Sequence, residues 1–221
     1  KETKIVKKIV VEDNQKVVPL AYIEPNQRSA MYISGVSGSG KSTYARNMID
    51  EIRENRKYKD YKIYLITGAK EMDPAFEKLD ELYVININNP QIFNLDYSVF
   101  AKCIVVFDDY EAVMEDDLKT HLLKLLKGLL ELSRKKQVII LTINHMTTNF
   151  NKTRNIIFES TEFVLFPRFN LNSCLKFLKA HMDLTKNELE EIKAISQTTR
   201  AITIRKAVPR VLVSDHVIWL L

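Results

Sequence analysis

The chain has 221 residues, of which 46% are hydrophobic and 28% are charged. This composition predicts a folded protein with room for one sizeable α/β domain and excludes wholesale disorder. No apolar run approaches the roughly 20 residues that cross a bilayer, and the two cysteines are too few for a disulfide framework. The charged first residues lack the apolar stretch of a secretory signal, so we expect a reducing, cytoplasmic location.

Charge is distributed unevenly along the chain, whose net charge is +5. Residues 1–131 hold 19 basic and 21 acidic side chains, whereas residues 132–221 hold 14 basic and 7 acidic ones. The basic second half suits a polyanionic partner. A solvated lysine-rich surface would have the same composition, so charge alone leaves both interpretations open.

The hydrophobic pattern alternates between strands and helices along the chain. We expect a short N-terminal arm over residues 1–28, with strands at Ile5–Val11 and Val17–Ile23, followed by one domain over residues 29–221. Further strands are predicted at Ala30–Ile33, Lys62–Ile66, Tyr83–Ile87, Cys103–Phe107, Val138–Ile143 and Phe163–Phe166. Helices are predicted at Lys41–Arg56, Asp73–Leu82, Glu115–Arg134 and Thr185–Ile195.

The C-terminal residues 201–221 alternate in polarity and predict a β-hairpin or small meander that turns near Pro209 and Asp215. Several of the preceding strands are apolar throughout, as are the strands of a parallel sheet that helices cover on both faces. The sequence therefore predicts a three-layer α/β fold with a mainly parallel central sheet.

A glycine-rich segment follows the strand predicted at Ala30–Ile33. Residues 35–42 read Gly-Val-Ser-Gly-Ser-Gly-Lys-Ser and match the pattern G-x-x-x-x-G-K-[ST] in full. Glycines let backbone amides approach phosphates, and the helix N-terminus that follows adds positive partial charge. Lys41 is predicted to reach the β- and γ-phosphates of ATP, and Ser42 to ligate Mg²⁺. The predicted nucleotide contacts are Gly35, Ser37, Gly38, Ser39, Gly40, Lys41, Ser42 and Thr43.

An acidic pair ends the apolar strand at Cys103–Phe107. An apolar strand that ends in an acid is the Walker B pattern, and we assign Asp108 to support Mg²⁺ from across the phosphate site. Asp109 then stands where many motor ATPases carry a catalytic glutamate, and it would orient or deprotonate the attacking water. Aspartate is shorter than glutamate, so Glu111 is the alternative for that role.

Polar residues also follow the strand predicted at Val138–Ile143. Ligands of open α/β sheets bind at the carboxyl ends of the strands, so Asn144 is placed to hold the attacking water or to contact the γ-phosphate. Asparagine is also common in turns, which is the alternative interpretation. His145 and His181 lack a set of Cys or His partners, so no metal role is predicted for them.

Arg134 closes the long predicted helix just before the same strand. An arginine at a subunit edge can reach the γ-phosphate of a neighbouring subunit as an arginine finger. A basic residue is also favoured at a helix C-terminus, so both interpretations stand. Arg154 and Arg168 are the other candidates for a finger.

The stretch from Ala30 to Leu221 resembles the genome-packaging ATPases of nucleocytoplasmic large DNA viruses, the poxvirus-type packaging motors of the FtsK–HerA superfamily. The resemblance is carried by residues 35–43, by Val-Val-Phe-Asp-Asp at 105–109 and by the span 132–145. The C-terminal Thr199-Arg200-Ala201-Ile202, with Pro209 and a terminal strand, is a fourth matching feature. The family usually carries glutamine where this chain has Asn144.

The resemblance implies a RecA-like P-loop core, Mg²⁺-dependent ATP hydrolysis and a homo-oligomeric ring that threads duplex DNA into a capsid. It also implies action in the cytoplasm, in a virus factory or in the virion, with capsid proteins as further partners. The basic second half supplies candidate contacts to the DNA backbone, which would be independent of base sequence and sensitive to salt. These candidates are Lys135, Lys136, Lys152 and Arg154.

Two other functions stay open at the level of sequence. A P-loop small-molecule kinase, for a sugar or a nucleoside, begins with the same Gly-Val-Ser-Gly-Ser-Gly-Lys-Ser-Thr segment. Such kinases usually carry an arginine-rich lid and an acceptor-binding aspartate after the second strand, whereas here that strand ends in Thr67-Gly68-Ala69-Lys70 and no arginine-rich lid is obvious. A nucleotide-gated interaction module would bind ATP without turnover, because Asp109 would fail to catalyse.

Overall fold

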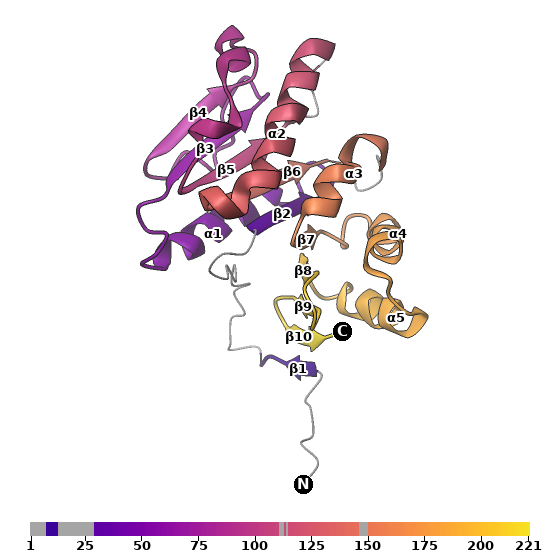
Figure 1. Cartoon of the computed structure of the whole chain (residues 1–221). Helices are drawn as coiled ribbons and strands as arrows, with labels where there is room; N and C mark the ends of the chain where they lie inside the picture. The colour runs from indigo at the N-terminus through magenta and orange to yellow at the C-terminus, as the bar shows by residue number, and fades with distance from the viewer. Residues whose placement is uncertain (1–7, 13–28, 111–112, 114, 146–149) are drawn as a thin grey trace.

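A mixed β-sheet runs through the computed structural model, which describes residues 8–12, 29–110, 113, 115–145 and 150–221. Within these residues ten strands pair in the order β1-β10-β9-β8-β7-β2-β6-β5-β3-β4 (Figure 1). The six strands from β7 to β4 are parallel, and the others pair antiparallel. The strands are β1 (Lys8–Val10), β2 (Ser29–Ser34), β3 (Lys62–Thr67), β4 (Leu82–Asn86), β5 (Cys103–Asp108), β6 (Val138–Asn144), β7 (Glu162–Leu165), β8 (Ile202–Arg205), β9 (Val211–Val213) and β10 (Val217–Leu220).

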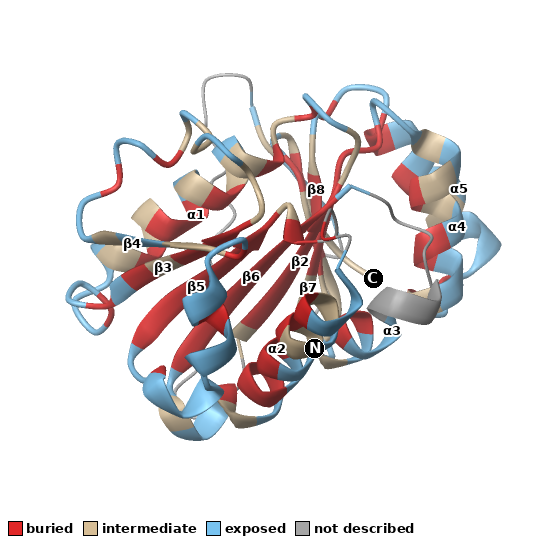
Figure 2. Ribbon diagram, turned by 90° about the horizontal axis from the view of Figure 1, so that it is seen from above, coloured by how far each residue is buried: buried red, intermediate tan, exposed pale blue. Residues whose placement is uncertain are grey.

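Helices cover both faces of this sheet, as Figure 2 shows from above. Residues of α1 belong to the core on one face, and residues of α2, α3, α4 and α5 belong to the core on the other. The predicted three-layer α/β fold is therefore confirmed. The helices are α1 (Lys41–Glu54), α2 (Asp116–Lys136), α3 (Phe150–Glu159), α4 (Leu171–Met182) and α5 (Lys186–Ile195), and the 3₁₀ helices are η1 (Pro90–Asn94) and η2 (Tyr97–Val99).

The central strands are apolar on both sides because each side meets a helix layer. In β2, Tyr32 packs with the α4 side chain Phe177, and the two rings stack at a centroid distance of 5.8 Å. The next residue, Ile33, points to the opposite face and joins the core formed with α1. All three side chains are fully buried. Full burial of a side chain of this size contributes roughly 1.5–3 kcal/mol, which favours the buried parallel arrangement.

The sheet order decides which loops meet. β6 lies between β2 and β5 and is parallel to both, so the carboxyl ends of these three strands share one edge of the sheet. The register pairs Ser34 of β2 with Asn144 of β6. The glycine-rich loop after β2 and the acidic pair after β5 therefore lie on either side of the end of β6.

The structure corrects one predicted helix. Residues 73–82 form successive tight turns and then enter β4. The carbonyl of Asp73 accepts from the amide of Phe76 at 2.9 Å, and its carboxylate accepts from the amide of Ala75 at 2.9 Å. These local bonds compete with helical hydrogen bonding, and burial of Phe76 anchors the turns.

Two helices were not predicted, α3 and α4. Asn170 caps α4, and its side chain accepts from the amide of Ser173. At the N-terminus, β1 lies within the predicted strand Ile5–Val11 and pairs antiparallel with β10, whereas the predicted strand Val17–Ile23 lies outside the described residues. No helix in the described part of the chain is both long enough and apolar enough to span a bilayer.

Candidate nucleotide-binding site

The glycine-rich loop connects β2 to α1 and turns through two residues with positive φ. Gly38 has φ 75° and Gly40 has φ 100°, and an L-residue adopts either value only at a cost. The amide of Ser39 donates to the carbonyl of Val36 at 3.2 Å, which closes a turn. Helix α1 begins at Lys41, so the positive end of its dipole lies directly after the loop.

A second constraint applies at Gly40. A Cβ atom there would lie 2.8 Å from Nη2 of Arg200, so the guanidinium would have to shift to admit a side chain. Arg200 also donates from Nε to the carbonyl of Ser39 at 3.0 Å. The loop therefore has a cationic side chain from the C-terminal part of the molecule packed against its last two residues before Lys41.

A cavity of about 350 Å³ opens beside the loop, a size typical of small-ligand sites. It brings together most of the nucleotide contacts predicted from the sequence and both acids after β5. Two of the predicted contacts do not line it, because Gly35 lies outside its wall and Ser39 is buried beneath the loop. The cavity is lined by Ser37, Gly38, Gly40, Lys41, Ser42, Thr43, Asp73, Asp108, Asp109, His145 and Arg200.

Lys41 is held across the mouth of the loop. Its side chain is 6% exposed, and Nζ donates to the carbonyl of Val36 at 3.0 Å. Phosphate oxygens are stronger acceptors for an ammonium group than a carbonyl is, because the charge of the acceptor strengthens the bond. The ammonium is thus placed to turn from Val36 to a phosphate in the cavity.

Asp108 and Asp109 provide carboxylates at the other side of the cavity. The pKa of Asp108 is raised from its ordinary 3.8 to about 6, mainly by burial and also by the charges of Asp109 and Asp73, against the opposing effect of His145 and Lys41. Binding of a divalent cation stabilises the ionised form of such a buried carboxylate, because the positive charge of the cation offsets the buried negative charge.

Mg²⁺ fits this donor set. It prefers oxygen ligands and usually takes one or two from protein, with the rest from phosphates and water. The hydroxyl of Ser42 and the carboxylate of Asp108 both line the cavity. Among the described residues, no group of three Asp, Glu, His or Cys side chains is placed to hold a metal ion.

Asp109 is fixed by the residue that follows β6. It sits in the left-handed region, with φ 50°, and its Oδ1 lies 2.6 Å from Nε2 of His145. Only one carboxylate oxygen is engaged in this contact, and Asp109 also lines the cavity. The ends of β5 and β6 are therefore joined by a direct contact beside the cavity.

A parallel contact joins the neighbouring residues. The hydroxyl of Tyr110 donates to Oδ1 of Asn144 at 2.5 Å, and Nδ2 of Asn144 donates to the carbonyl of Thr142 at 3.2 Å. Asn144 is fully buried and does not line the cavity. Its amide is engaged inside the protein, and the residue that reaches the cavity from this strand end is His145.

The remaining predicted residues lie away from the cavity. Arg134 is exposed in the last turn of α2, just before β6 begins, and so lies at the sheet edge opposite the glycine-rich loop. Lys136, in the same turn, donates to the carbonyl of Ser98 at 2.6 Å. Lys135 and Arg154 are exposed. Glu111 and the side chain of Lys152 lie outside the described residues.

Sequence reasoning did not assign Asp73, His145 or Arg200 to the cavity. Asp73 comes from the turns that replace the predicted helix, and His145 follows Asn144 directly, so a shift of one residue would have found it. The sequence pointed to Arg200 only through its place in the segment Thr199–Ile202, which is one of the features that carry the family resemblance.

A smaller cavity, of about 220 Å³, adjoins the first. The two share Gly40, Thr43 and Arg200 as wall residues. The aromatic rings of Tyr44 and Phe166 contact edge to face at 6.2 Å, and the hydroxyl of Tyr44 lies 2.6 Å from that of Thr203. The second cavity is lined by Gly40, Thr43, Tyr44, Asn47, Phe166, Arg200, Ala201, Ser214 and Asp215.

Comparisons with known proteins place this site in a recognised fold. No family model matches the chain. A search of curated proteins finds an uncharacterized protein, V3, of the Sputnik virophage, 28% identical over 204 residues that cover 89% of this chain and 80% of V3.

Solved structures give the fold. The genome packaging NTPase B204 of Sulfolobus turreted icosahedral virus 2, in complex with ATP-gammaS, matches with a TM-score of 0.53 and 9% identity over 87% of this chain and 98% of B204. The fold is that of the RecA-like P-loop ATPases. The Type VII secretion ATPase EccC of Thermomonospora curvata matches with a TM-score of 0.57 and 12% identity over 86% of this chain, which spans 25% of the EccC chain.

Proposed function

We propose that this chain is an ATP-hydrolysing motor that translocates duplex DNA and packages a viral genome into a capsid. One observation carries the ATPase part: a single cavity brings together Lys41 and Ser42 of the glycine-rich loop with Asp108 and Asp109. These are a phosphate-binding cation, two oxygen donors for Mg²⁺ and a further carboxylate, and together they are the groups that phosphoryl transfer to water requires.

The nucleotide is proposed to bind with its phosphates in the larger cavity. Backbone amides of the loop and the N-terminus of α1 supply donors, and Lys41 supplies the charge for the β- and γ-phosphates. Ser42 and Asp108 would hold Mg²⁺, which neutralises charge on the phosphates when bound. The second cavity, with Tyr44 and Phe166, would hold the nucleoside half because it adjoins the first and shares Gly40, Thr43 and Arg200 with it.

Asp109 is proposed as the base for the attacking water. Its carboxylate lines the cavity, and the contact with His145 fixes its direction. Glu111 is retained as the alternative. The side-chain oxygen of Asn144 is bound to the hydroxyl of Tyr110, so Asn144 would not contact the γ-phosphate directly. It would sense the γ-phosphate through a movement of the end of β6.

The DNA-translocating part is supported by the fold and by the distribution of charge. The chain has the fold of B204, whose name describes a genome packaging NTPase, and a relative in a virophage. The net charge of residues 132–221 is positive, which suits sequence-independent contact with the DNA backbone through residues such as Lys135 and Arg154. We further propose a homo-oligomeric ring that acts in the cytoplasm or the virion, in which the exposed Arg134 reaches the site of a neighbouring copy.

The test is the rate of ATP hydrolysis with and without duplex DNA, alongside the mass in solution. We expect DNA to stimulate hydrolysis, and Lys41→Ala to reduce it by about 100-fold or more because it removes a charge from the developing transition state. Lys59→Ala, a change at an exposed lysine outside the cavity, is the matched control and should hydrolyse ATP as the wild type does. Rapid phosphorylation of a small acceptor without a DNA response would instead establish a kinase. Binding of ATP without turnover would establish an interaction module.

A further inference from the structure

Arg200 lies at the junction of the two cavities. It belongs to the segment between α5 and β8, and it lines both the larger cavity and the smaller one. Its Nε donates to the carbonyl of Ser39 at 3.0 Å, and its Nη2 would be 2.8 Å from a Cβ at Gly40. The guanidinium is therefore seated against the backbone of the glycine-rich loop.

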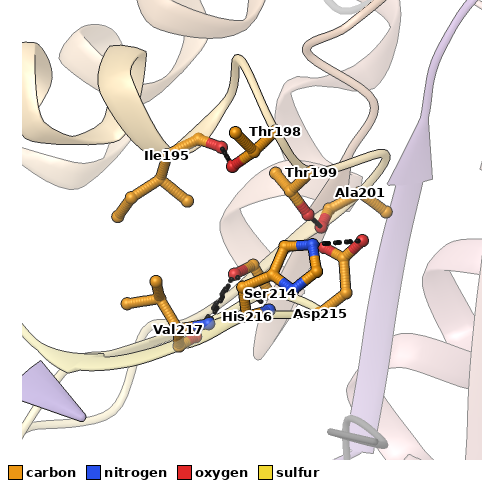
Figure 3. Close-up of polar contacts among 8 residues, drawn as sticks. All are labelled: Ile195, Thr198, Thr199, Ala201, Ser214, Asp215, His216 and Val217. Carbon is orange, nitrogen blue, oxygen red and sulfur yellow. Dashed lines mark hydrogen bonds and ion pairs between the residues drawn. The ribbon is translucent and has the colours of Figure 1, made fainter. Parts of the chain in front are cut away.

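The segment that carries Arg200 has a defined backbone, as Figure 3 shows. On one side the hydroxyl of Thr198 donates to the carbonyl of Ile195 at 3.2 Å. On the other, the hydroxyl of Thr199 donates to the carbonyl of Ala201 at 3.1 Å, and Thr199 is 1% exposed. Arg200 is thus presented from a backbone that is held immediately before and after it, so little ordering is needed when a ligand binds.

The facing wall of the smaller cavity is equally well held. The hydroxyl oxygen of Ser214 accepts from the amides of His216 at 3.3 Å and Val217 at 3.0 Å, which closes the turn between β9 and β10 (Figure 3). Ser214 and Asp215 line this cavity together with Arg200. The junction is therefore bounded by two ordered segments that come from the C-terminal part of the chain.

Two cationic side chains can bind an anion here, although carboxylates also line both cavities. The larger cavity has two permanently cationic wall residues among those described, Lys41 at the mouth of the loop and Arg200 at the boundary with the smaller cavity. Only Nε of Arg200 makes a hydrogen bond to a residue that the structure describes. The remaining donors of its planar fork match the oxygens of a phosphate, to which arginine binds through two parallel bonds.

We propose that Arg200 binds the α-phosphate of the nucleotide held by its own chain. The inference rests on the proposed function, because it assigns the phosphates to the larger cavity and the nucleoside to the smaller one. The α-phosphate is the one bonded to the ribose, so it must lie where the two cavities meet. Lys41 then takes the β- and γ-phosphates, and Arg200 anchors the part that ATP and ADP have in common.

This assignment separates Arg200 from an arginine finger. A finger contacts the γ-phosphate and affects turnover, whereas a contact to the α-phosphate affects the affinity for ATP and ADP alike. Loss of a charge-assisted hydrogen bond of this kind weakens binding by about 10–100-fold. We therefore expect Arg200→Ala to weaken the affinities for ATP-gammaS and for ADP by a similar factor. Hydrolysis at saturating ATP should stay near the wild-type rate.

The experiment measures the dissociation constants for ATP-gammaS and ADP, with Mg²⁺, by titration calorimetry. Arg200→Ala is compared with Arg200→Lys, which keeps the charge but loses the fork and should fall between wild type and alanine. Arg56→Ala, at an exposed arginine after α1, is the matched control and should bind both nucleotides normally. Thermal unfolding without nucleotide shows whether each variant is folded. Should alanine fail to fold, Arg200→Gln keeps a donor for the Ser39 carbonyl and removes the charge.

A similar loss for both nucleotides in Arg200→Ala, and also in Arg200→Gln, which keeps a donor for the Ser39 carbonyl, supports the proposal. Weakening confined to ATP-gammaS, or a loss of turnover with intact affinity, would assign Arg200 to the γ-phosphate and overturn it. In another outcome, Arg200→Ala binds both nucleotides with unchanged affinity while Lys41→Ala loses nucleotide binding. This result would overturn the role of Arg200 and leave the proposed function standing. A wild-type protein that binds neither nucleotide would overturn both.

Discussion

Nε2 of His145 lies 2.6 Å from Oδ1 of Asp109, and this contact links the end of β6 to the acidic pair after β5. It exists because β6 lies between β2 and β5 in the sheet. The residue after β6 is therefore near both the glycine-rich loop and the acids. If the end of β6 moves when a γ-phosphate binds, His145 would move the carboxylate of Asp109, which is proposed to act on water.

We expect His145→Ala to lower the rate of ATP hydrolysis by about tenfold, because Asp109 loses the contact that fixes its direction. The affinity for ATP should change less than the rate, since His145 contacts the carboxylate proposed to act on water. His145→Asn should recover part of the rate by restoring a hydrogen-bond donor. Asp109→Asn should bind ATP and hydrolyse it at least about 100-fold more slowly. A rate in His145→Ala equal to that of the wild type would show that the contact does not position the base.

Gly38 and Gly40 offer a matched pair of substitutions. Both have positive φ, so alanine costs about 1–2 kcal/mol of stability at either position. At Gly38 nothing lies within 4 Å of the added Cβ, whereas at Gly40 the Cβ would lie 2.8 Å from Arg200. We expect Gly40→Ala to be the more destabilising variant in urea unfolding. The double variant Gly40→Ala with Arg200→Ala should recover part of the difference, and equal loss in both single variants would argue against the contact.

Asp108 predicts a pH dependence of stability in the absence of Mg²⁺ and nucleotide. Its pKa is raised from 3.8 to about 6 in the folded protein, mainly by burial. The proton that the folded state retains stabilises it fully below pH 4, and this contribution is lost as the pH rises through 6. At pH 8 with a chelator, Asp108→Asn should therefore be more stable than the wild type, by about 1–3 kcal/mol. The difference should vanish near pH 4, and Mg²⁺ with ATP should stabilise the wild type more than the variant. A less stable Asp108→Asn at pH 8 would contradict the burial argument.

Arg134 gives a test of the proposed ring. It is exposed at the sheet edge opposite the nucleotide cavity, so a role in hydrolysis requires a neighbouring copy. We expect Arg134→Ala to bind ATP normally and to lose turnover. Mixing it with Lys41→Ala subunits should restore some activity. In the mixed ring, the intact nucleotide site of an Arg134→Ala subunit can lie next to the intact Arg134 of a Lys41→Ala subunit. Unchanged turnover in Arg134→Ala would remove this residue from the mechanism.

A glycine on α2 shows how tertiary packing overrides local propensity. Glycine weakens a helix interior, so sequence alone favours alanine at Gly128. In the structure a Cβ at Gly128 would overlap the ring of Tyr97, in η2, so alanine there would require that ring to move. The turns at residues 73–82 also replace a helix that the sequence pattern predicts. There Asp73 accepts hydrogen bonds from the amides of Ala75 and Phe76, and the side chain of Phe76 is buried.

The sequence by itself determined the parts of the protein whose chemistry depends on adjacent residues. These are the glycine-rich loop that ends at Lys41, the apolar strand that ends at Asp108, and the alternation that predicts a layered α/β fold. Only the tertiary structure decided that Asn144 turns to Tyr110 while His145 faces Asp109, because one residue along a strand reverses the side-chain direction. The contact of Arg200 with Ser39 spans 161 positions, and strand pairing from β8 through β7 to β2 brings the two together. A local pattern carries no information on such pairing, because it depends on the free energy of the whole sheet.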